Sequence, residues 1–343
     1  MGHDSEMDAV GSDYGKANFI KIHTDKQIYY GGDKISGKVM LSLMQPMIAD
    51  GIYILLEGYE KTSFEDHTAT EFLMHSKCLL YHHCCIHYVG GETIQPGNYV
   101  LPFTVKLTTG KSGSFALPKG LDEDTNADTF YKIQADFRIS PQETLTSEQE
   151  IIICNPAPPM NLYNVPEREG KVSYLWCIPK GLASLCVKIE QCDYKPGDPI
   201  EVFLEVNNAS TVDLPSLKVE LTRTIKICAD NSYKLYKETM SSCYLKGPKA
   251  GETSQYTANL KIPRVTPAQT FGALITCQYL VRTTLDVPWS SAIVHKWTVQ
   301  VFQPEKSDYQ KNFTYPLGCE TTTFHTINLA TMPCEDDDMF GIA

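Results

Sequence analysis

The chain has 343 residues, of which 42% are hydrophobic and 21% are charged, and its formal net charge is −11 at pH 7. This length and composition are typical of a soluble globular protein of about two domains. The acidic charge excludes nucleic acid as a main partner, because that binding depends on a basic surface.

No window of the sequence approaches the ~20 consecutive apolar residues of a membrane-spanning helix. Residues 1–6 are polar and acidic, unlike a secretory signal peptide. We therefore expect a cytoplasmic protein in which the 12 cysteines are reduced thiols.

The N-terminal half predicts short strands separated by turns. Ile52, Ile54 and Leu56 alternate with residues of a second face, as expected for a sheet with one face in a core. The same alternation recurs at 101–107 and 130–137. No segment has a convincing helical pattern, and if this half holds a short helix, we expect it at 66–78.

One phrase of the sequence occurs twice. Tyr29–Val39 contains a tyrosine, Gly32 and an Asp-x-Ile, and Asp193–Val202 repeats this order around Gly197. In the second copy Pro196-Gly197 has the chemistry of a type II turn, in which glycine takes the positive φ. A turn and strand that recur once, about half a chain apart, predict two similar domains in tandem.

The C-terminal half repeats the alternating pattern more clearly, at 200–206, 217–222 and 296–301. Such strands favour antiparallel β-sandwiches. The expected organisation is a disordered N-terminus (1–16), a first domain (17–155), a proline-rich linker (156–169), a second domain (170–304) and a mobile acidic tail (305–343).

At this point the sequence resembles the arrestin superfamily, and most of all the α-arrestins (arrestin-domain-containing proteins). The motifs that carry the resemblance follow the family's order over roughly residues 18–303. They are Ile35-Ser36-Gly37-Lys38-Val39, Leu56-Glu57-Gly58-Tyr59-Glu60, Leu101-Pro102-Phe103, Tyr131-Lys132-Ile133-Gln134-Ala135, Val206-Asn207-Asn208-Ala209-Ser210 and Cys277-Gln278-Tyr279-Leu280-Val281.

The resemblance implies an all-β fold of two tandem antiparallel, immunoglobulin-like β-sandwiches. It also implies an adaptor without enzymatic activity, recruited to the plasma membrane or endosomes, that binds cytosolic tails or loops of membrane proteins and links them to trafficking adaptors. A stable coat subunit similar to the arrestin-fold subunit of retromer is the alternative.

The chain departs from the family at three places. It lacks the Pro-Pro-x-Tyr motif through which α-arrestins recruit ubiquitin ligase machinery, and no clathrin-box leucine run is evident in the tail. Lys21 stands alone where visual and β-arrestins have adjacent phosphate-binding lysines. Ligase recruitment and phosphate sensing are therefore not implied for this chain.

Two further clusters are candidate sites. His83, Cys85 and His87 could share one face of a strand and bind zinc, although a strand with buried cysteines and surface histidines is the favoured interpretation. Asp337, Asp338 and Phe340 in the acidic tail could form a short partner-binding motif, against the alternative of a solvated end. No catalytic motif and no cofactor-binding motif occurs, so we expect neither catalysis nor a cofactor.

Overall fold

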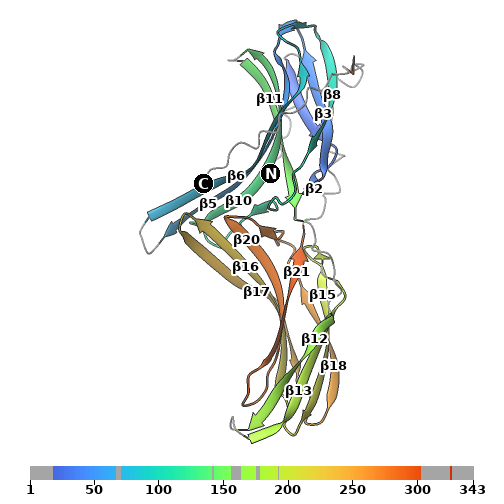
Figure 1. The fold of residues 1–343 in the computed structure, drawn as a ribbon, viewed down its shortest axis with the longest axis vertical. Helices are drawn as coiled ribbons and strands as arrows, with labels where there is room; N and C mark the ends of the chain where they lie inside the picture. Colours follow the sequence, from blue (N-terminus) through green and yellow to red (C-terminus); the bar gives the residue numbers. More distant parts are fainter. Residues whose placement is uncertain are drawn as a thin grey trace, which may run out of the picture.

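The computed structural model describes residues 18–66, 71–140, 143–155, 164–174, 178–191, 193–302 and 325–326. All regular elements in these ranges are β-strands, arranged as two β-sandwiches placed end to end (Figure 1). The same ranges contain no helix that could cross a membrane. The prediction of two tandem β-sandwiches is confirmed.

The first sandwich, here called the N-domain, has a smaller and a larger sheet. In spatial order, the smaller sheet consists of β1 (Phe19–Thr24), β3 (Lys34–Leu43), β8 (Gly97–Lys106) and β22 (His325–Thr326). The larger sheet consists of β2 (Ile28–Tyr30), β11 (Glu143–Cys154), β10 (Asn126–Ser140), β5 (Gly51–Asp66) and β6 (Glu71–Tyr88), with β9 (Phe115–Ala116) paired to β10. A separate two-stranded pair is formed by β4 (Met47–Ile48) and β7 (Thr93–Ile94).

The second sandwich, the C-domain, repeats this plan. Its smaller sheet consists of β12 (Asn164–Tyr174), β13 (Ile178–Ile189), β15 (Pro199–Ser210) and β18 (Thr253–Lys261). Its larger sheet consists of β14 (Asp193–Tyr194), β21 (Ile293–Val301), β20 (Ile275–Leu285), β16 (Ser216–Ala229) and β17 (Ser232–Lys246), with β19 (Thr270–Phe271) paired to β20. In both domains the short strand that contains the repeated tyrosine, β2 or β14, lies parallel to its neighbour. All other pairs of described strands are antiparallel except β22 with β8.

The repeated phrase forms the same turn in both domains. Gly32 has φ +94° and Gly197 has φ +99°, the left-handed region that glycine enters without a Cβ clash. Asp33 follows the first glycine and its carboxylate accepts the N–H of Tyr30 at 2.9 Å, while Asp198 accepts the N–H of Lys195 at 2.8 Å. The glycine and aspartate of the repeat are therefore the residues that close and stabilise each turn.

The residues that the alternating pattern predicts to be buried form the two cores. Ile52, Ile54 and Leu56 are each at most 1% exposed and pack in the N-domain core, and the even-numbered residues of 200–206 do so in the C-domain. The C-domain core also extends across the domain boundary, because Phe64, Phe115 and Ala127 of the N-domain belong to it. The two domains therefore share buried apolar surface.

Two segments differ from what the sequence indicates. The sequence has no convincing helical pattern, and within 66–78, where a short helix would have been expected to lie, β5 ends at Asp66 and β6 is a strand from Glu71 onward, paired with β5. Strand pairing with β5 outweighs the weak helical preference of single residues here. β12 begins at Asn164, inside the segment expected as linker.

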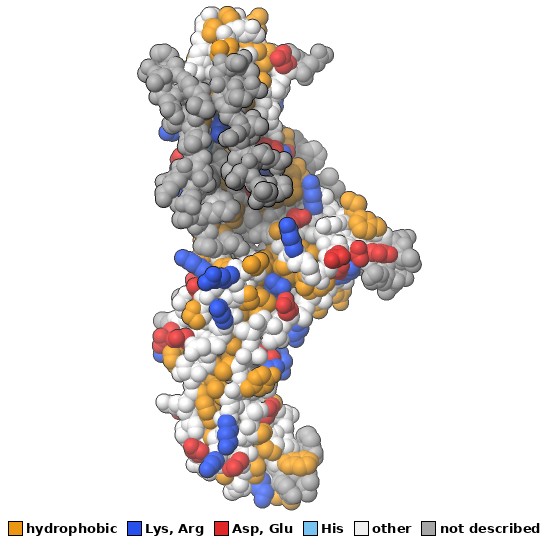
Figure 2. Space-filling model, turned by 180° about the vertical axis from the view of Figure 1, so that it is seen from behind, with side chains coloured by type: hydrophobic (Ala, Val, Ile, Leu, Met, Phe, Trp, Pro, Cys, Tyr) orange, Lys and Arg blue, Asp and Glu red, His pale blue; other side chains and the backbone are white. Residues whose placement is uncertain are grey.

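The two larger sheets shape the molecule. Their inner faces meet at the middle of the protein, where β5 and β6 lie beside β16, and β10 lies beside β20. This junction projects sideways from the long axis (Figures 1 and 2). The outer face of each larger sheet curves away from it and is concave (Figure 1). We call these surfaces the N-domain and C-domain concave faces.

Candidate functional site

The junction between the domains contains a buried carboxylate. Glu60 of β5 points inward, in the same parity as the core residues before it, and is 0% exposed. Its Oε2 atom accepts the backbone N–H groups of Ala273 at 2.9 Å and Leu274 at 3.0 Å. Gly272 lies against the same carboxylate, and a Cβ at that position would overlap its Oε1 atom. One N-domain side chain thus fixes the turn before β20 in the C-domain.

A second polar group joins the N-domain loop before β10 to β17. The Asp122 carboxylate accepts hydrogen bonds from Tyr236 Oη at 2.5 Å, Lys234 Nζ at 3.0 Å and Thr125 Oγ1 at 2.9 Å. These donors, with that of Tyr236 the strongest, hold the pKa of Asp122 well below its usual range. Burial, and then the bond to Asp122, raises the pKa of Tyr236 to about 12.

Three further contacts cross the boundary. Thr62 Oγ1 donates to the carbonyl of Cys228 at 2.6 Å, and Thr270 Oγ1 donates to the carbonyl of Gly113 at 2.9 Å. His75 Nδ1 lies 3.1 Å from Asp230 Oδ1 at the exposed margin. Together with the shared apolar core, these bonds couple the domains, so the two concave faces are held in a defined relation.

The sequence did not single out the junction. Glu60 belongs to the motif Leu56-Glu57-Gly58-Tyr59-Glu60 that carries the family resemblance, but that motif gives it no role at a junction. One signal was present, because Ile52, Ile54, Leu56 and Glu60 all fall on even positions of one strand, the parity of its buried face. The two backbone N–H groups that Glu60 accepts lie more than 200 positions further along the chain, as the separation of 213 between Glu60 and Ala273 shows, and no sequence pattern announces them.

The N-domain concave face carries mixed charge with a shallow aromatic hollow. Lys132 lies 3.3 Å from Glu57 and 3.1 Å from Glu148, so its charge is paired on both sides. Lys61 lies over the ring of Phe130, with Nζ 4.9 Å from the ring centroid. These residues line a cavity of about 650 Å³. Such a surface offers hydrogen bonds and aromatic contacts to a peptide.

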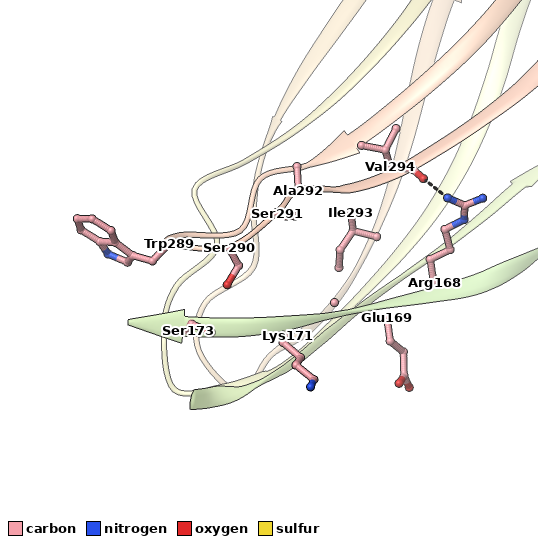
Figure 3. A pocket seen from close by; sticks show the side chains of 11 residues that line it. Arg168, Glu169, Lys171, Ser173, Trp289, Ser290, Ser291, Ala292, Ile293 and Val294 are labelled. Carbon is pink, nitrogen blue, oxygen red and sulfur yellow. Dashed lines mark hydrogen bonds between the residues drawn. The ribbon is translucent and has the colours of Figure 1, made fainter. Parts of the chain in front are cut away.

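The C-domain concave face carries more cations than the N-domain concave face. Two smaller cavities lie at its margin. A cavity of about 420 Å³ lies between β12 and the segment that leads into β21. Figure 3 shows Arg168 on β12 beside Val294, whose carbonyl accepts a hydrogen bond from Arg168 Nη1 at 2.9 Å. In the same view Trp289 points away from the other lining residues. Trp289 has φ +53°, in the left-handed region.

The proposed zinc ligands are only partly brought together. His83 and Cys85 lie on the outer face of β6, opposite Leu55 and Tyr53. His83 stacks on Tyr53 at 5.3 Å, and its Nε2 lies 2.9 Å from Nη2 of Arg138. Burial, and then the Arg138 charge, lowers the pKa of His83.

His87 lies on β6, opposite Ile52, but its side chain is outside the described part of the protein. Within that part, no three His, Cys, Asp or Glu side chains are grouped as metal ligands. The zinc site therefore stays a hypothesis. The tail candidates Asp337, Asp338 and Phe340 lie outside the described residues.

Two tandem sandwiches, joined by a shared core and displaying concave outer faces, define an arrestin-type two-domain protein. Comparison with family models gives the same result. The arrestin (or S-antigen) N-terminal domain model matches residues 19–156, and the arrestin (or S-antigen) C-terminal domain model matches residues 179–322. The chain belongs to the arrestin superfamily.

Curated relatives carry the arrestin-domain name. The chain is 21% identical over 307 residues to arrestin domain-containing protein A of Dictyostelium discoideum, covering 84% of this chain and 52% of that protein. It is 22% identical over 321 residues to arrestin domain-containing protein 4 of Mus musculus, covering 86% of this chain and 73% of that protein. The expected likeness to the α-arrestins is confirmed, and the chain spans about half the length of the Dictyostelium relatives.

Proposed function

We propose that this protein is a non-enzymatic, cytoplasmic adaptor that binds cytosolic tails or loops of membrane proteins and links them to endocytic or endosomal sorting machinery. Membership of a family of adaptors supports the class of function. The observation that carries the proposal is the pair of concave faces, held in a defined relation by the buried junction.

The two faces suit extended peptides for a physical reason. Among the described strands, β6 pairs only with β5 and β17 only with β16, so each larger sheet, as far as it is described, ends in a strand suited to strand addition. Exposed apolar side chains mark both strands, with Met74 69% exposed on β6 and Tyr233 62% exposed on β17. A cytosolic loop or tail is a segment of this kind, and no catalytic step is needed to capture it.

The test is affinity purification of the full chain from detergent-solubilised membranes, followed by mass spectrometry. A variant with Tyr233→Ser and Leu235→Ser removes two exposed apolar side chains from the C-domain concave face. The control variant, Ile48→Ser and Val265→Ser, removes two exposed apolar side chains elsewhere. Transmembrane and endocytic proteins should be enriched by the wild type and the control, and less by the first variant.

Two results would contradict the proposal. The first is a failure of the wild-type chain to enrich transmembrane or sorting proteins over beads alone. The second is recovery of one fixed partner at equal stoichiometry without cargo, seen by native mass spectrometry, which would favour the stable coat subunit. Recruitment to the plasma membrane or endosomes is checked by imaging the tagged chain in cells.

A further inference from the structure

Charge is distributed unequally between the two concave faces. In the C-domain, the strands β16, β17, β20 and β21 direct one carboxylate, Glu220, to this face together with the cations Lys218, Lys226, Lys237, Lys246, Arg282 and Lys296. In the N-domain, the equivalent strands direct more carboxylates than cations, namely Glu57, Glu65, Asp128, Asp136, Glu148 and Glu150 against Lys61, Lys132 and Arg138. A basic concave face thus stands on a chain of net charge −11.

Three of the C-domain cations surround one small cavity. Arg168, Arg282 and Lys296 line a volume of about 240 Å³, with Val294 as the fourth lining residue. Arg282 and Lys296 are direct cross-strand partners on β20 and β21. Like charges directly opposite each other destabilise a sheet, so this arrangement costs stability unless an anion lies between them.

The carboxylate nearest to this cavity is already engaged. Glu220 lies opposite Arg282, with Oε1 4.0 Å from Arg282 Nε, and its other oxygen is paired with Lys218. Arg282 Nε is buried and has no hydrogen-bond partner among the described residues. A buried donor without a partner is unfavourable, and an incoming acceptor would relieve it.

A hydrogen bond to a backbone carbonyl positions the Arg168 side chain at the same cavity. Its guanidinium donates to the Val294 carbonyl at the edge of β21, as Figure 3 shows, which holds the side chain across the gap between β12 and β21. One Nη group is used in this bond, and a guanidinium has further donors in a fixed fork that matches a carboxylate. The cavity therefore presents two arginines and a lysine to a single acidic group.

A cation and a ring lie beside the level of this cavity on the same face. Glu220 of β16 is the cross-strand partner of Arg282, and Lys218 is two residues before it on β16. Lys218 Nζ lies 5.5 Å from the ring centroid of Tyr244 on β17, the last strand of the described sheet. A bound segment that crosses from β21 to β17 at this level thus meets a cation and then an exposed aromatic ring.

We propose that the Arg168–Arg282–Lys296 cavity binds a carboxylate side chain of an extended acidic peptide, and that the peptide continues along the C-domain concave face toward β17. The inference rests on the proposed adaptor function, because it names the chemistry of the captured segment. The curvature favours a peptide over a lipid surface, since a flat bilayer cannot follow a concave sheet.

Binding is measured by fluorescence anisotropy with the full chain. The probe is a labelled peptide of alternating Asp and Ser, and the matched peptide has Asn for every Asp. The test variant carries Arg168→Gln, Arg282→Gln and Lys296→Gln. The control variant carries Lys188→Gln, Lys249→Gln and Lys261→Gln, which removes the same charge from exposed lysines outside this face. Circular dichroism and thermal melting verify that both variants are folded.

The Asp peptide should bind the wild type and the control equally, and the test variant about tenfold or more weakly, because charge-assisted hydrogen bonds are lost. Equal affinity for the Asp and Asn peptides, or an equal loss in both variants, would overturn the proposal. So would binding of phosphatidylserine-containing vesicles, but not of the Asp peptide, through the same three residues.

The failure of this inference can be separated from failure of the adaptor function. If the test variant still enriches transmembrane proteins from membrane extract as the wild type does, the cavity is not the capture site, while the adaptor function stands. If the wild type enriches none, the adaptor function itself fails, whatever the peptide result.

Discussion

Replacing Glu60 by alanine tests whether the buried carboxylate holds the two domains together. The substitution removes the acceptor of two backbone N–H groups, those of Ala273 and Leu274, at 2.9 and 3.0 Å. The N–H of Leu274 is then a buried donor without a partner, while the N–H of Ala273 is only partly buried. A buried donor without a partner costs about 1–3 kcal/mol, so the free energy of unfolding should fall by about that amount, with a smaller addition from Ala273.

Urea unfolding measures this loss through the midpoint concentration, with an unchanged slope as the sign of an unchanged unfolding transition. Hydrogen exchange followed by mass spectrometry locates it, because the peptide that contains Ala273 and Leu274 should lose protection before the N-domain strands do. The control is Glu57→Ala, on the outer face of the same strand, which should change stability much less. The reasoning is refuted if Glu60→Ala and Glu57→Ala have equal effects, or if protection at 273–274 is unchanged.

A double-mutant cycle isolates the contact with Gly272. A methyl group at that position would overlap Glu60 Oε1, so Gly272→Ala should be strongly destabilising in the wild-type background. In the Glu60→Ala background the overlap disappears, and the same substitution should cost clearly less. Additive losses in the cycle would show that the carboxylate does not lie against Gly272 in solution.

The remaining predictions concern the Asp122 group and two glycines. The pKa of Asp122 is lowered in the folded state. Its contribution to the free energy of unfolding is therefore present above the pKa of the unfolded state, about 4, and is lost as the pH falls below that value. When the free energy of unfolding is measured at decreasing pH, it should fall less for Asp122→Asn than for the wild type. Gly58→Ala should destabilise the N-domain by about 1–3 kcal/mol in urea unfolding, because its Cβ would overlap the ring of Tyr131, and an unchanged midpoint would contradict this. Gly197→Ala places a Cβ at φ +99° and should lower the free energy of unfolding by about 1–2 kcal/mol. Gly247→Ala is unsuitable as its control, because a Cβ at Gly247 would overlap the Leu214 carbonyl.

The strand pattern of the chain was predictable from local chemistry. Burial in a strand alternates with a period of two, so Ile52, Ile54 and Leu56 identify a core face without knowledge of the partner strands. The turns were predictable for a similar reason, since glycine can take the positive φ observed at Gly32 and Gly197 without a Cβ clash. The order of the repeated turn and of the family motifs along the chain then indicated the two domains and the family.

The sites depend on residues that are brought together from separate strands. The pairing of Arg282 with Lys296, and the reach of Arg168 to Val294, follow from registers that local sequence does not specify. The same is true of β6, whose strand form depends on pairing with β5 rather than on its own residues.

The sequence alone determined an acidic, all-β, two-domain protein with its repeated turns, because alternation and turn chemistry are local properties. Only the tertiary structure decided that Glu60 is buried at the junction and that the basic residues gather on one concave face. The physical reason is that burial of a polar group, and the potential of a surface, are set by neighbours distant in sequence.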